Sequence, residues 1–116
     1  MVNLIQITKG TVTTALDSIT ATTTSGVIEC RNYNAVIIDA TIGAGATYKL
    51  DIQGSNTANG TFHDIYSANN ATQLTSGNLT ASRMMVFAGV PDYIKIVATE
   101  VGGASTCTVI VQPIIM

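Results

Sequence analysis

The chain has 116 residues, a formal net charge of −2 and only 10% charged residues, against about 25% in an ordinary soluble domain. This length is typical of one domain. Five scattered Lys and Arg residues exclude a basic nucleic-acid-binding face, and no apolar run reaches the ~18 residues of a membrane span. We therefore expect neither nucleic acid nor membrane as a partner.

The start of the chain has neither the basic region nor the long apolar segment of a cleaved leader. We therefore expect synthesis in a cytoplasm without export through a signal peptide. The Thr-rich, β-branched, charge-poor composition favours pleated sheet over helix.

The first quarter of the chain predicts short strands separated by turns. We expect strands over Val2–Thr8, Ile19–Thr24 and Val27–Cys30, with turns at Asp17-Ser18 and Ser25-Gly26. Because Thr occurs on both faces here, residues 1–26 form either an edge-strand region or an arm that orders only against a partner.

Tyr33–Ile42 predicts the strongest strand of the first half. Its even-numbered positions from Val36 onward form one apolar face, whereas Tyr33, Ala35 and Ile37 lie on the other. Apolar residues on both faces indicate either a central strand covered on both sides or a subunit contact.

Tyr48–Ile65 predicts a central hairpin around which the other strands pair. Apolar and polar residues alternate over Tyr48–Gln53, as expected for a strand with one buried face. The segment Gly54–Gly60 is rich in Gly, Ser and Asn and predicts an exposed turn. Phe62 opens a second apolar run.

In the second half we expect a long polar loop over Tyr66–Ser76 and strands over Arg83–Ala88 and Tyr93–Thr99. Gly102-Gly103 predicts a hairpin with Ser105–Gln112 as its return strand. Pro113 is expected to end that strand and to leave an apolar tail, Ile114-Ile115-Met116, which a neighbouring subunit could bury.

Short strands with Gly, Asn or Pro between them predict an all-β, single-domain fold over residues 1–116. The expected architecture is an antiparallel β-sandwich, jelly roll or small barrel of about seven to nine short strands.

The sequence shows no group of residues suited to catalysis, so we expect that the protein is not an enzyme. His63 is the single histidine, and the adjacent Asp64 would point to the opposite face of a strand. Cys30 and Cys107 lie in apolar strands and are expected to be either buried thiols or a disulfide between neighbouring strands. No cofactor or metal site is expected.

Three other kinds of site have weaker support. Paired carboxylates for glycoside hydrolysis could be Asp39 and Asp51 if they are cross-strand neighbours, although carboxylates on a wet face are usually only solvated. Oxygen ligands for calcium could come from Asp51, Asn56, Asn59 and Asp64, at a spacing that matches no known loop. Aromatic residues for sugar binding would be Tyr66 and Tyr93, with Phe62 beside them.

Three segments carry a resemblance. Leu50-Asp51-Ile52-Gln53-Gly54-Ser55-Asn56, followed by Gly60-Thr61-Phe62, resembles the pattern V-x-V-Q-G-S-N-D-G-x-x-W, with an altered turn and Phe for Trp. Pro91–Ile96 is similar to an A-R-Y-V-R-I strand, and Gly102–Val109 is similar to its G-G-x-x-T-V-x-V return. Discoidin-like sandwiches share this layout, as do small tailed-bacteriophage virion proteins that decorate or cement the capsid.

The virion proteins match the length and low charge better. This resemblance implies a homotrimer on the capsid surface whose partner is the major capsid protein, with no catalytic residues. Under this interpretation we expect the assembly contacts at Tyr33, Ile37, Ile114, Ile115 and Met116. The alternative is a carbohydrate-binding or receptor-binding module of a phage fibre or tail.

Overall fold

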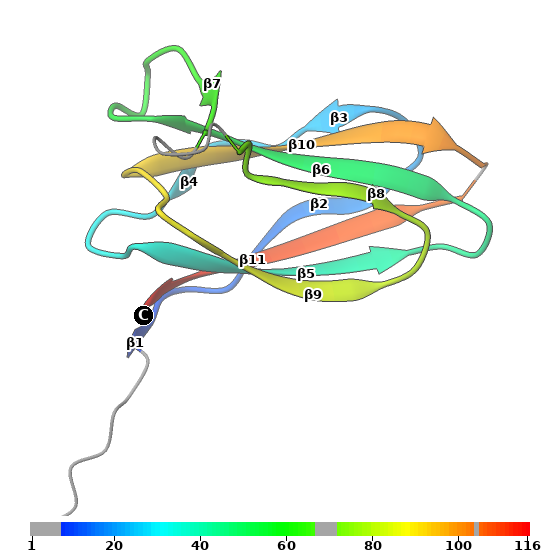
Figure 1. The fold of residues 1–116 in the computed structure, drawn as a ribbon, viewed down its shortest axis with the longest axis horizontal. Helices are drawn as coiled ribbons and strands as arrows, with labels where there is room; N and C mark the ends of the chain where they lie inside the picture. Colours follow the sequence, from blue (N-terminus) through cyan, green and yellow to red (C-terminus); the bar gives the residue numbers. More distant parts are fainter. Residues whose placement is uncertain (1–7, 67–71, 104) are drawn as a thin grey trace, which may run out of the picture.

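Two antiparallel sheets pack face to face in the computed structural model, which describes residues 8–66, 72–103 and 105–116 (Figure 1). Except for Thr8, the strand expected over Val2–Thr8 lies outside the described residues. The first sheet, called the β5 sheet, contains β1 (Thr8–Lys9), β2 (Thr13–Ile19), β11 (Cys107–Ile115), β5 (Ala35–Ile42) and β9 (Arg83–Ala88). The second, called the β6 sheet, contains β3 (Thr23–Thr24), β4 (Ile28–Glu29), β10 (Tyr93–Gly102), β6 (Thr47–Ser55), β7 (His63–Asp64) and β8 (Thr75–Leu79).

The described part of the chain has eleven strands, more than the seven to nine expected, because three outer rows are each split into two short strands. Strands β1 and β2 both pair with β11, β3 and β4 both pair with β10, and β7 and β8 both pair with β6. The strands therefore fill eight rows, in the order 1-8-3-6 in the β5 sheet and 2-7-4-5 in the β6 sheet. Successive rows change sheet except between β6 and the β7–β8 row, as in the two Greek keys of a jelly roll.

Side chains from the inner faces of both sheets form one core. On β5, the predicted apolar face is confirmed, since Val36, Ile38 and Ala40 are fully buried. On β6, the alternation of Tyr48, Leu50 and Ile52 with polar residues likewise points the apolar side chains inward. Further core residues are Leu16, Ile28, Leu79, Ile94, Ile96, Ala98, Val109 and Val111.

The predicted turn at Asp17-Ser18 is wrong, because both residues lie inside β2. Opposite them, β11 has one residue fewer between the pairs Cys107–Ile19 and Val109–Leu16, so the row carries a β-bulge. Ser18 has a positive φ of 50° and donates its backbone N–H to the Thr108 hydroxyl at 3.0 Å.

The predicted turn at Ser25-Gly26 is also wrong. Ser25 lies between β3 and β4 and is bonded to β10 through its backbone N–H, which donates to the Ile96 carbonyl at 2.8 Å. The Ser25 hydroxyl accepts the Ile96 N–H at 2.9 Å. A hydroxyl thus completes the ladder where the outer row is irregular.

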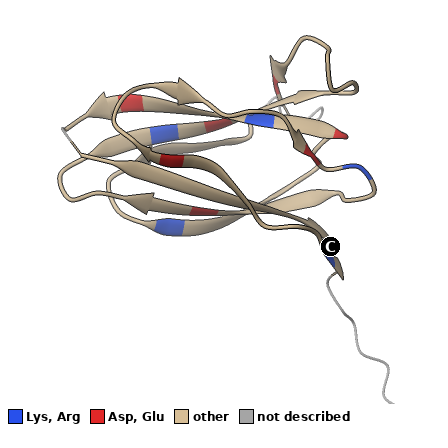
Figure 2. Cartoon of the chain, turned by 180° about the vertical axis from the view of Figure 1, so that it is seen from behind, with Lys and Arg blue, Asp and Glu red and all other residues tan. Residues whose placement is uncertain are grey.

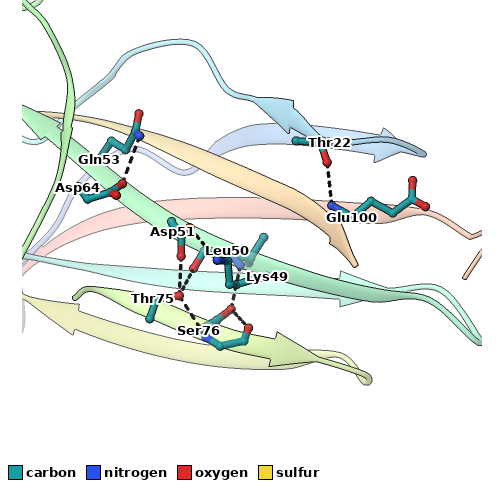
Figure 3. A network of polar contacts seen from close by, with 10 residues as sticks. Thr22, Lys49, Leu50, Asp51, Gln53, Asp64, Thr75, Ser76 and Glu100 are labelled. Atoms are coloured by element: carbon teal, nitrogen blue, oxygen red, sulfur yellow. Dashed lines mark hydrogen bonds and ion pairs between the residues drawn. The ribbon is translucent and has the colours of Figure 1, made fainter. Parts of the chain in front are cut away.

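At two further positions in or beside the outer rows, a side-chain hydroxyl likewise accepts a backbone N–H of the neighbouring central strand. Ser76 accepts the Leu50 N–H at 2.9 Å, and Thr22 accepts the Glu100 N–H at 3.0 Å (Figure 3). Residues 67–71 of the long loop expected over Tyr66–Ser76 lie outside the described residues, and the expected end of the loop is wrong because Thr75 and Ser76 belong to β8. The Ser and Thr residues of the outer rows supply acceptors to backbone donors that a split strand would leave unpaired.

Two predictions about the end of the chain are corrected. Gly102-Gly103 does not join a hairpin, because β10 and β11 belong to opposite sheets. Pro113 does not end its strand, because β11 continues to Ile115. The Pro113 carbonyl accepts the Gly10 N–H at 2.7 Å. In an antiparallel strand the backbone N and C=O of one residue point to the same side. The Pro113 nitrogen, which has no hydrogen to donate, therefore points toward the irregular segment between β1 and β2, where no regular strand pairing is lost.

Candidate functional site

A depression of about 620 Å³ lies where the β6–β7 loop meets the connection between β9 and β10. Its lining residues are Gly54, Ser55, Asn56, Thr57, Gly60, Thr61, His63, Asp64, Ile65, Gly89, Val90 and Pro91. The exposed turn predicted over Gly54–Gly60 is therefore not isolated, as a second segment converges on it. At the contact, a Cβ on Gly54 would stand 2.4 Å from Pro91 Cγ, so glycine allows this close approach.

The depression combines hydroxyl groups with an apolar floor. Part of the loop is held by its own bonds, since the Ser55 hydroxyl donates to the Thr57 carbonyl at 2.8 Å and accepts the Thr57 N–H at 3.1 Å. Ile65, Val90 and Pro91 supply apolar surface. Such a surface can make hydrogen bonds and apolar contacts to a polyhydroxylated ligand.

His63 and Asp64 are neighbours on β7, and both are exposed. The Asp64 carboxylate accepts a hydrogen bond from Gln53 Nε2 at 3.2 Å, across the β6–β7 pair. In the described residues no hydrogen bond joins the side chains of His63 and Asp64, so the carboxylate orients Gln53 rather than the imidazole.

The structure brings together two of the four oxygen donors considered for calcium: Asn56 and Asp64 line the depression, whereas Asp51 and Asn59 do not. Asp51 bonds to the Thr75 hydroxyl at 2.5 Å and lies 3.6 Å from Lys49 Nζ (Figure 3). Asp64 lies on β7, where it pairs with Gln53 of β6. Across residues 8–66, 72–103 and 105–116, no cluster of three or more His, Cys, Asp or Glu residues could hold a metal.

Asp39 and Asp51 are not cross-strand neighbours. Asp39 lies on β5 and Asp51 on β6, and these strands belong to opposite sheets. Both side chains point away from the shared core, because their sequence neighbours in each strand are buried. The sequence could not reveal this, since alternation places a residue on a face but does not say to which sheet its strand belongs.

Both cysteines are free and buried. Cys30 follows β4 in the β6 sheet, whereas Cys107 begins β11 in the β5 sheet. Burial, with smaller contributions from Asp92 and Glu29, raises the pKa of the Cys30 thiol to about 11. Burial also raises the pKa of Cys107. A thiol that stays protonated is a poor nucleophile.

The aromatic residues considered for sugar binding are dispersed. Tyr66 is 55% exposed, and Tyr93 is half-buried on β10. Lys95 Nζ lies 4.6 Å from the centroid of the Phe62 ring, so a cation already occupies one face of that ring.

The residues expected in assembly contacts have different exposures. Tyr33 and Ile37 are half-buried, whereas Ile115 and Met116 are 41% and 66% exposed. Ile114 is buried by its own chain, at 2% exposure. Among these five, Ile115 and Met116 present the most exposed surface to a neighbour.

No helix in the described residues is long and apolar enough to cross a membrane.

Charged side chains are unevenly distributed, with most of them on the β6 sheet and its loops (Figure 2). The two outer faces of the sandwich therefore differ in chemistry.

No protein-family model matches the chain, and no curated protein matches it in sequence. A solved structure does match: the crystal structure of the SPBc2 prophage-derived protein YomS. The two chains superpose with a TM-score of 0.68 over 98% of this chain and 99% of YomS, at 12% sequence identity. At this identity the similarity establishes a shared all-β fold over the length of both chains.

Proposed function

We propose that the chain is a structural protein of a bacteriophage particle. The observation that carries this proposal is the end-to-end structural similarity to a prophage-derived protein. Jelly rolls are common in viral capsid proteins, which adds support from the topology. The sequence resemblance to small phage virion proteins points the same way.

The specific role proposed is decoration of the capsid surface. As a homo-oligomer, the protein would bridge neighbouring copies of the major capsid protein and resist internal DNA pressure through the additional buried area. The exposed tail residues Ile115 and Met116 would supply apolar contacts to the capsid. This role requires no catalytic group and no cofactor.

Co-sedimentation with purified expanded capsids of the encoding phage tests this role. The wild-type protein is expected to pellet with capsids to a fixed stoichiometry. Ile115→Asp should weaken capsid binding at least tenfold, whereas Val101→Asp, at a similarly exposed residue of the β6 sheet, should not. Absence of wild-type pelleting, together with a monomeric native mass at every concentration, would refute the proposal.

A second candidate is a carbohydrate-binding or receptor-binding module of a phage fibre or tail. The depression beside the β6–β7 loop favours it, because hydroxyls, His63 and Asp64 surround an apolar floor. The low aromatic content, 5% of the chain, weighs against it, since sugars usually stack on aromatic rings.

A glycan array tests the second candidate. Binding at millimolar affinity or tighter that Asp64→Asn reduces, and that Asp17→Asn on β2 leaves unchanged, would favour the module. Loss of binding in Tyr66→Ala or Phe62→Ala would instead place the sugar against those aromatic rings. An array with no binding would count against any glycan ligand.

A further inference from the structure

The outer face of the β5 sheet carries an apolar patch that reaches from the β1–β2 row to β9. Val12, Met84 and Val86 are 58%, 65% and 52% exposed. Ile37 and Ile110, on the central strands of the sheet, line a shallow depression together with Val12 and Met84, and Asp39 and Gln112 are its polar members. Exposed apolar side chains that form one continuous patch mark a contact surface.

The outer face of the β6 sheet differs because its charges already have partners within the chain. Lys49 pairs with Asp51 at 3.6 Å. Asp64 is bonded to Gln53, and Lys95 lies over Phe62. The outer face of the β6 sheet therefore has the properties of a surface exposed to water. Burial against a partner would remove more apolar surface from water at the outer face of the β5 sheet.

Two charged residues on the apolar face have no partner among the described residues. Asp39 is half-buried between Ile110 and Met84, its neighbours on β11 and β9. Lys9 is opposite Ile114, which is opposite Ala35, so alternation places Lys9 on the same face as Asp39. Neither side chain makes an ion pair or hydrogen bond within the described part of the chain.

We infer that this face packs against the same face of a second copy of the chain, related by a two-fold axis. The contact is self-complementary, because an apolar centre meets an apolar centre and each Asp39 can meet the partner's Lys9. A half-buried carboxylate with apolar side chains opposite it on both neighbouring strands is less well solvated than an exposed one, so it gains from a cation brought by the partner.

The area agrees with a weak but specific dimer. Eight residues of β5 span about 26 Å, and four rows ~4.8 Å apart add a width of about 19 Å. The face then offers about 500 Å² per copy, or about 1,000 Å² for the pair, which is near the lower limit for a specific interface. We expect a micromolar dissociation constant.

This inference gives the proposed homo-oligomer a two-fold contact in place of the homotrimer that the resemblance implies, and it does not depend on capsid binding. It is tested on the isolated full-length protein, so its failure is distinct from a failure to co-sediment with capsids. Sedimentation equilibrium should show a mass that rises with concentration from one copy to two. A mass that stays monomeric up to about 0.5 mM, or that reaches three copies, would overturn the inference.

Substitutions test the location of the contact. Val86→Arg should weaken dimerisation at least tenfold, whereas Val101→Arg, at an exposed valine of the β6 sheet, should leave it unchanged. Both side chains are exposed, so both variants should keep the wild-type circular dichroism spectrum. Equal weakening by the two substitutions would exclude the β5 sheet as the contact.

A charge exchange tests the two-fold pairing. Asp39→Lys should weaken dimerisation because it places two cations opposite each other. Adding Lys9→Asp to this variant should restore most of the lost affinity, since opposite charges would again meet. A double variant no tighter than Asp39→Lys would overturn the proposed pairing.

Discussion

Tyr48 brings a polar atom into an otherwise apolar core. Its side chain is fully buried, and its hydroxyl lies 3.0 Å from the Ser105 carbonyl and 3.3 Å from the Ile19 carbonyl. A hydroxyl has one proton, so it donates to one of these carbonyls at a time. The hydroxyl thus links β6 to the connection between β10 and β11 and to the end of β2 in the opposite sheet.

Tyr48→Phe should therefore lower the free energy of unfolding by about 1–2 kcal/mol, because two part-buried carbonyls lose their donor while the ring still fills the core. Urea unfolding monitored by circular dichroism measures the loss. Tyr66→Phe is the control, since that ring is 55% exposed and water can replace its hydroxyl. Equal losses in the two variants would contradict the role of the Tyr48 hydroxyl.

Cys30 predicts how stability responds to alkaline pH. Its pKa is raised from an ordinary value of 9.0 to about 11 in the folded protein. The unfolded chain therefore releases this proton at lower pH than the folded chain does. The stabilising contribution is complete below pH 9 and is lost as pH rises through 11.

Cys30→Ala should be less stable than the wild type at pH 7, because it leaves a small cavity. Its unfolding free energy should then fall less steeply between pH 9 and 11, since it lacks this titrating group. Urea titrations under reducing conditions at several pH values measure both slopes. If the unfolding free energies of the wild type and of Cys30→Ala fell equally steeply with pH, the Cys30 thiol would not couple folding to pH.

At the scale of the elements, the outer rows depend on hydroxyl groups. Ser25 is 7% exposed, and its hydroxyl accepts the Ile96 N–H where β3 ends and β4 has not begun. Ser82 accepts the Ile42 N–H at 3.0 Å but is itself exposed. The two serines differ in whether water can take their place.

Ser25→Ala should lower the free energy of unfolding by about 1–3 kcal/mol, because the Ile96 N–H would be left buried without an acceptor. Ser82→Ala should cost less than about 1 kcal/mol, since water can reach the vacated position. Chemical denaturation and amide hydrogen exchange at Ile96 measure the effect. Slow exchange at Ile96 in Ser25→Ala would show that another acceptor had replaced the hydroxyl.

At the scale of the whole molecule, the two cysteines report on opposite sheets. Each thiol is fully buried in the single core that both sheets share. If the sandwich opens only as a unit, a thiol reagent should label Cys30 and Cys107 at the same rate, and that rate should match global unfolding.

Mass spectrometry of labelled peptides at increasing urea measures both rates. Single variants Cys30→Ala and Cys107→Ala assign each signal. Faster labelling of Cys107 would show that the end of the fold near the start of β11 opens locally, which would contradict a single cooperative unit.

The sequence predicted the fold class and much of the core. Period-two alternation on β5, β6 and β10 identified the buried face of each strand, because a strand that covers a core on one side must alternate. It also predicted the hairpin between β6 and β7, since that pairing is local. The sequence did not predict β8. The Thr, Ser, Gly and Asn residues of β8 are typical of a loop, and they form a strand because they pair with β6.

Which strands distant in the sequence pair, and in which sheet each strand lies, was decided by the tertiary structure alone. Ser25 bonds Ile96 across 71 residues, and Tyr48 bonds Ser105 across 57. Alternation says which face of a strand is apolar, but it does not say what lies against it. For this reason the sequence could not place Asp39 and Asp51 on opposite sheets. It indicated the apolar outer face of β5 at Ile37, but not that Val12, Met84 and Val86 extend this face. By itself the sequence determined an all-β fold, because side-chain periodicity is local, whereas the pairing of distant strands into two sheets depends on contacts that form only in the folded chain.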